Sequence, residues 1–238
     1  MEGTLPQTPY LIIEMVWQFS QKYWRKLAIF VIMIGASGLG LVAARDPFSS
    51  RGALLLTAVA LLIFTWVDAA LVLFFYQIFK GQVPRTTTTL IVGMSRLGPA
   101  FALVVITQLG IAAGLALFII PGAWIAFITS LAFPAFILGE LSVPRALRES
   151  LKLTTTHTGA MLRLLVIPWL FWEIVTLLIA GIAYLVWTTL HGASQGGDPQ
   201  TALYFIILAA VAITRPMVIA SRTLVFFTTY AVRTNNRT

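Results

Sequence analysis

Six long apolar stretches divide this chain, and charged or turn-forming residues border each of them. The stretches are residues 27–44, 52–79, 97–120, 122–139, 164–190 and 201–225. A helix needs about 20 apolar residues to cross the hydrocarbon core of a bilayer, and a longer one can tilt. The sequence therefore predicts an all-α integral membrane protein with six transmembrane helices. All 238 residues are expected to form a single membrane domain.

The composition excludes a soluble domain. Apolar residues make up 59% of the chain and charged residues only 10%, whereas a typical soluble domain carries about 25% charged residues. The chain has no cysteine, which excludes a disulfide framework, a thiolate metal site and a thiol nucleophile.

The lysines and arginines predict the orientation in the membrane. Of the 16, 13 fall in the N-terminal arm, in the second and fourth connections and at the C-terminal end. The positive-inside rule therefore predicts that both termini are cytoplasmic. The net charge of +8 also favours binding to anionic lipid head groups. A nucleic-acid partner is not expected, because the charges form neither a basic stripe nor a known recognition motif.

Two cytoplasmic segments have the polar and apolar periodicity of helices that lie in the head-group layer. The first is 8–26, where polar residues recur at helical spacing, and the second is 143–158. A weaker, threonine-rich candidate begins at Val83. Together with the span borders, these segments present the basic side chains expected to face lipid or a partner protein: Lys22, Arg25, Lys26, Arg145, Arg148, Lys152 and Arg222.

The order of these segments suggests three repeated units. Each unit would hold an interfacial segment, a span outward and a span back, with starts near Thr8, Val83 and Val143. The alternative is that positive-inside topology imposes this order without any duplication.

One region resembles a known superfamily. Pro121-Gly122 is followed by Pro134, by Glu140 and then by the run from Ala146 to Leu153 with Ser150 at its centre. This pattern resembles a bacterial multi-pass superfamily that includes YciC-type proteins and the membrane domain attached to some glycerophosphodiester phosphodiesterases. The resemblance implies an inner-membrane protein of undefined biochemical role. The soluble phosphodiesterase domain is absent from this sequence, so its activity is not implied.

Three ionisable residues lie within the predicted spans. Asp68, Glu173 and Arg215 are each about 13–17 Å from the cytoplasmic edge at 1.5 Å per residue, close to the midplane. Because such charges are costly in a bilayer, Arg215 is expected to pair with Asp68, with Glu173 or with both. One interpretation is a structural ion pair that joins spans. The other is a proton or ion relay, in which one of the two carboxylates is protonated at neutral pH.

Other motifs point to packing rather than chemistry. Gly110 and Gly114 form a GxxxG motif for close helix packing, inside the chain or in a homo-oligomer. The run from Gly35 to Gly38 resembles the serine motif of rhomboid proteases, but no histidine follows within a span, so packing is the favoured interpretation. His157 and His191 are predicted on opposite sides of the bilayer and cannot share a metal ion. No cofactor motif is present.

The sequence supports two hypotheses about function. The first is a non-enzymatic inner-membrane scaffold or accessory subunit that engages anionic lipid or a partner through its amphipathic cytoplasmic face. The alternative is a small transporter or permease that uses the midplane cluster; an intramembrane hydrolase is a remote third. A wet cavity that reaches Asp68 and Glu173 would favour transport, whereas a dry and fully paired cluster would favour the scaffold.

Overall fold

The computed structural model describes residues 8–43, 51–156, 158–191 and 199–235, and every regular element in these ranges is a helix. The helices are α1 (Pro9–Ala43), α2 (Arg51–Phe79), α3 (Thr86–Ser95), α4 (Leu97–Leu117), α5 (Ile119–Thr129), α6 (Ala132–Leu138), α7 (Val143–Thr156), α8 (Thr158–His191) and α9 (Pro199–Asn235). The predicted all-helical class is confirmed.

Five helical segments of the described chain are long and apolar enough to cross a membrane. They are α2, α4, the segment formed by α5 and α6, most of α8, and most of α9. The other predicted span, 27–44, falls in the second half of α1 and is not one of these five. The structure therefore supports a multi-pass membrane protein with five candidate spans.

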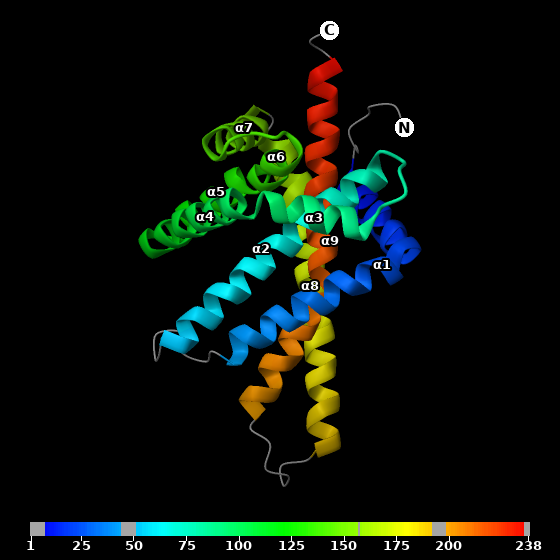
Figure 1. Cartoon of the computed structure of the whole chain (residues 1–238), viewed down its shortest axis with the longest axis vertical. Helices are drawn as coiled ribbons and strands as arrows, with labels where there is room; N and C mark the ends of the chain where they lie inside the picture. The colour runs from blue at the N-terminus through cyan, green and yellow to red at the C-terminus, as the bar shows by residue number, and fades with distance from the viewer. Residues whose placement is uncertain (1–7, 44–50, 157, 192–198, 236–238) are drawn as a thin grey trace.

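The long helices form three hairpins whose tips point in different directions (Figure 1). The hairpins are α1 with α2, α4 with α5 and α6, and α8 with α9. A short helical segment precedes each hairpin: the first half of α1, then α3, then α7. These segments and the last turns of α9 lie in the upper half of Figure 1, while the far ends of the hairpin helices lie to the left and below. The last turns of α9 project beyond its neighbours.

The first half of α1 packs against the bundle. Ile12 and Val16 are completely buried, so this face of the amphipathic helix contacts protein rather than lipid. The Ser20 hydroxyl donates a hydrogen bond of 2.7 Å to the sulfur of Met217 in α9. Non-helical backbone angles at Tyr23 then kink α1 and redirect it into the first hairpin. The predicted boundary near residue 26 corresponds to this kink.

The second hairpin turns at a different place from the one predicted. The sequence suggests Pro121-Gly122, but α4 ends at Leu117 and the extended residue Phe118 makes the turn. Pro121 lies in the first turn of α5, where its missing N–H costs no helical hydrogen bond. A proline in an apolar run thus marks the start of the returning helix rather than the turn itself.

The predicted fourth span, 122–139, is two helices rather than one. The break at Ser130 and Leu131 separates α5 from α6. Pro134 explains it, because proline has no N–H to donate to the Ser130 carbonyl and its ring clashes with that carbonyl in a continuous helix. The break leaves backbone polar groups at membrane depth, which is tolerated where they face protein or a cavity.

The GxxxG motif packs within its own hairpin. A Cβ atom placed on Gly114 would lie 2.8 Å from the Cα of Gly122 in α5, so only glycine permits this approach. A Cβ on Gly110 would meet only the Ile125 side chain at 3.6 Å, an ordinary contact. The partner of Gly114 is thus α5 of the same chain.

Candidate functional site

A charged cavity of about 280 Å³ lies between the hairpins. Residues of α2, α4, α5, α6, α8 and α9 line it, together with Ser130 at the break between α5 and α6. Its wall combines apolar side chains with polar ones, which are Thr65, Asp68, Thr107, Gln108, Thr129, Ser130, Glu173, Thr176, Thr214, Arg215 and Arg222. The predicted midplane residues Asp68, Glu173 and Arg215 therefore meet at one site.

Helical periodicity explains how these charges come to one place. Arg215 and Arg222 are seven residues apart in α9, about two turns, so both face the cavity. Trp169 and Glu173 share a face of α8 by the same rule at a spacing of four. Asp68 reaches the site from α2, which packs against α9.

Arg215 and Asp68 form a bidentate ion pair. The Nε of Arg215 donates to Oδ1 of Asp68 at 3.2 Å, and its Nη2 donates to Oδ2 at 2.6 Å. The guanidinium also lies 4.4 Å from the centre of the Phe64 ring, a favourable cation–π distance. The Arg215 side chain is 37% exposed and that of Asp68 is 14% exposed, so the pair borders open space. Of the two acids that the sequence offers to Arg215, the structure pairs it with Asp68.

Glu173 and Arg222 line the same cavity without an ion pair to any described residue.

Two contacts between α8 and α9 fix the level of Glu173, a residue of α8, relative to α9. Thr176 hydrogen-bonds Thr214 at 2.6 Å, and the Trp172 ring N–H donates to the Ser221 hydroxyl at 3.3 Å.

These contacts place Glu173 about level with Val218 of α9. At 1.5 Å per residue it lies about 4.5 Å along the axis from Arg215 and about 6 Å from Arg222. Glu173 therefore sits between the two arginines in depth, while Asp68 already neutralises one of them.

Two basic residues occupy places other than those predicted. The sequence predicts that Arg222 reaches lipid phosphate, but it lines the cavity because it shares a helix face with Arg215. Lys26 is predicted to face lipid or a partner protein, and in the structure its ammonium donates a 2.7 Å hydrogen bond to the Pro84 carbonyl, which joins α1 to the segment before α3.

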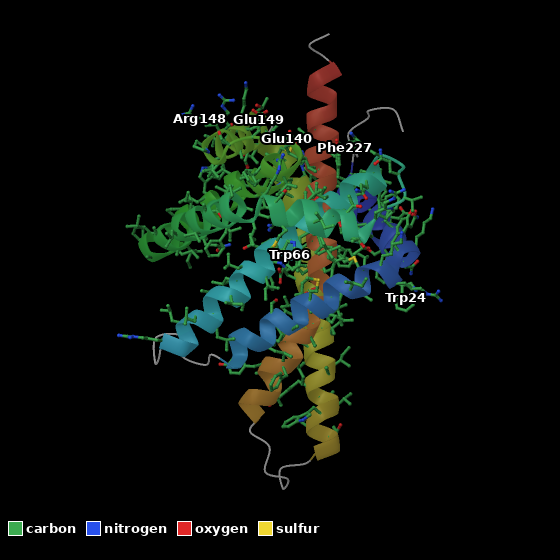
Figure 2. All side chains as sticks on the ribbon, viewed as in Figure 1. Trp24, Trp66, Glu140, Arg148, Glu149 and Phe227 are labelled. Carbon is green, nitrogen blue, oxygen red and sulfur yellow. The ribbon has the colours of Figure 1, made fainter. Side chains whose placement is uncertain are left out.

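The remaining basic residues lie on the surface. Arg145, Arg148 and Lys152 are exposed on one face of α7, and Lys22 and Arg25 are exposed on α1. Figure 2 shows Arg148 at the outer edge of α7, away from the bundle, and Trp24 at the edge of α1. The opposite face of α7 carries the buried residues Ala146, Ser150, Leu153 and Thr154.

Ser150 connects this amphipathic helix to the cavity wall. Its hydroxyl donates a 2.6 Å hydrogen bond to the carbonyl of Ile128, just before the break between α5 and α6. The side chain thus satisfies a carbonyl at the point where the helix is interrupted. Ser150 belongs to the run that carries the superfamily resemblance.

The polar residues of α4 and α5 are absent from the site that the sequence predicts. Thr107, Gln108 and Thr129 are isolated polar residues in apolar stretches, and both threonine hydroxyls also donate to carbonyls of their own helices. In the sequence, only an amide or a hydroxyl within a predicted span marks them as candidates for the site. A search for ionisable residues alone does not find them.

The other sequence candidates show packing roles or cannot be placed. The buried Ser37 donates to the Ile34 carbonyl at 2.9 Å, and Gly38 faces the Leu208 side chain of α9 so closely that a Cβ would clash. His157 and the side chain of His191 lie outside the described residues. In the described ranges, no three metal-ligating side chains of histidine, aspartate or glutamate come together.

Comparison with known proteins gives no match: no protein-family model, curated protein or solved structure is detectably similar to the chain. The superfamily resemblance therefore stays a prediction.

Proposed function

We propose that this protein is a small, non-enzymatic membrane transporter or permease that binds a polar solute in the cavity between its hairpins. One observation carries the proposal: the cavity reaches the Asp68–Arg215 pair and is also lined by Glu173 and Arg222, which have no ion-pair partner among the described residues. A purely structural cluster would be expected to close its charges on one another, since unpaired charge at membrane depth is costly.

We propose further that the chain spans an inner membrane six times with both termini in the cytoplasm. The second half of α1 supplies the sixth span, because it continues the kinked helix into a hairpin with α2. In support, the short helices α3 and α7, the first half of α1 and the last turns of α9 gather on one side of the molecule, and the far ends of the hairpin helices lie away from them (Figure 1). The short helix before each hairpin supports three related units.

Uptake into proteoliposomes tests transport. Radiolabelled small organic anions, cations and zwitterions would each be offered to vesicles with and without the protein. We expect at least one class to enter faster with the protein, and Asp68→Asn and Glu173→Gln to reduce that uptake at least tenfold. Uptake equal to that of protein-free vesicles for every class, or uptake unchanged in both variants, would contradict the proposal.

A second candidate function is the engagement of anionic lipid by α7. Its exposed face carries Arg145, Arg148 and Lys152 beside the half-exposed Leu151, a combination typical of helices in the head-group layer. Native mass spectrometry with phosphatidylglycerol tests it. Replacing the three basic residues by glutamine should remove most of the retained lipid, whereas replacing Lys80 and Arg85, which lie outside α7, by glutamine should not.

A further inference from the structure

We infer that the cavity binds a small zwitterion, with Glu173 holding its ammonium group and Arg222 holding its anionic group. This inference rests on the proposed function and names the class of solute. Neither of these charged residues closes an ion pair with a described residue, yet both line one cavity.

The charges of the site support this class over a simple ion. The bonds between Arg215 and Asp68 already match one positive charge to one negative charge. What remains is one carboxylate and one guanidinium. A lone anion would pair only with Arg222 and a lone cation only with Glu173, so either would leave one of these two residues without an ion-pair partner in the cavity. A ligand with both groups satisfies both residues.

Glu173 and Arg222 lie at neighbouring levels of the cavity without an ion pair between them. Arg222 lies about 6 Å from the level of Glu173 along α9, and no nitrogen–oxygen contact within 4.0 Å joins them. Charge-assisted hydrogen bonds are about 2.8 Å long. We expect a ligand with its ammonium and its anionic group one to four carbons apart to reach both residues. The guanidinium of Arg215, 37% exposed, also borders the space for the anionic group.

The size and lining of the cavity fit a ligand as small as an amino acid. Its volume of about 280 Å³ is just below the roughly 300–1,000 Å³ that encloses drug-sized ligands. Thr107, Gln108 and Thr129 supply neutral hydrogen-bonding groups to the cavity wall from α4 and α5. A soluble amino acid and the head group of a zwitterionic lipid share this chemistry.

Calorimetric titration of the full chain in nanodiscs tests the inference. The probes are glycine, β-alanine and 4-aminobutyrate, with acetate and ethylamine as matched single-charge compounds, in discs of phosphatidylglycerol alone. We expect at least one zwitterion to bind at least tenfold more tightly than acetate or ethylamine. Loss of this binding when phosphatidylethanolamine is added would assign the site to the lipid head group. Unchanged binding would assign it to the soluble zwitterion.

Single variants distinguish the loss of a ligand contact from a loss of folding. Glu173→Gln should remove the preference for glycine over acetate but keep acetate binding, and Arg222→Gln should remove the preference over ethylamine but keep ethylamine binding. Retained single-charge binding shows that each variant is folded. The matched changes Glu14→Gln and Arg85→Gln, outside the cavity, should leave all affinities within twofold of the wild type.

Two results distinguish this inference from the proposed function. The assignment of the ligand class is overturned if no zwitterion binds more tightly than acetate or ethylamine and no zwitterion displaces these two compounds. Protein-dependent uptake of a simple anion or cation would then leave transport standing. If no class of solute enters the proteoliposomes, transport is overturned as well.

Discussion

At the scale of single residues, the Asp68–Arg215 pair joins two helices that are far apart in sequence. The two hydrogen bonds of 3.2 and 2.6 Å use the planar fork of the guanidinium, which a lysine could not reproduce. Sequence alone indicates that Arg215 needs an acidic partner at membrane depth. It leaves Asp68 and Glu173 open as candidates, because the choice depends on how α2 and α8 pack around α9.

Removing one member of this pair should destabilise the protein, and removing both should restore part of the loss. Breaking a fully buried ion pair costs about 3–5 kcal/mol. Because Arg215 is 37% exposed, solvent screens the remaining charge, and we expect about 1–2 kcal/mol for Asp68→Asn. The measurement is unfolding of the purified protein in detergent. The double variant, Asp68→Asn with Arg215→Gln, should lose less stability than Asp68→Asn alone. A strictly additive loss would show that the pair does not couple α2 to α9.

At the scale of elements, single residues determine where the chain turns, where a helix breaks and where two helices pack closely. Apolar runs and charged borders predict most helices, but they do not reveal that Phe118 makes the second turn or that Pro134 interrupts the fourth span. Proline is compatible with a turn, a helix start and a break. Which of these occurs depends on packing that a single stretch of sequence does not contain. The amphipathic pattern of 8–26 likewise predicts a helix but not its docking on α9.

The two glycines of the GxxxG motif should respond differently to alanine. A methyl group on Gly114 would meet the Cα of Gly122 at 2.8 Å and force the hairpin apart, so Gly114→Ala should cost about 1–3 kcal/mol. Gly110→Ala, where the nearest atom is 3.6 Å away, is the matched control and should cost less than about 0.5 kcal/mol. Thermal unfolding of both variants checks this. Equal effects would contradict the assignment of the tight contact to Gly114.

Ser150 should matter more than the other hydroxyls of α7. Ser150→Ala leaves the Ile128 carbonyl without its 2.6 Å donor at the break beside the cavity, with an expected cost of about 1–3 kcal/mol. Thr155→Val is the control, because that exposed hydroxyl bonds only the Leu151 carbonyl of its own helix. Unfolding in detergent gives the comparison. If both changes have the same small effect, α7 does not support the broken helix.

At the scale of the whole molecule, we propose that three splayed hairpins enclose a hydrated, charged site between them. The sequence predicts the helical class, most helix positions and the three midplane charges, because each follows from local composition and depth. It does not predict the cavity or the entry of Arg222 into it. Those depend on the angles between hairpins and on the rotation of α9, which residues distant in sequence determine.

Cysteine labelling tests this claim most directly, and the chain contains no native cysteine to interfere. Ser130→Cys places a thiol on the cavity wall, and Ala135→Cys places one in the fully buried core. In proteoliposomes, a charged, membrane-impermeant methanethiosulfonate reagent would be applied from each side in turn. A hydrated transport site predicts that the thiol at position 130 reacts from both sides while the thiol at position 135 does not react. No reaction at position 130 from either side would show a dry cluster and contradict the account.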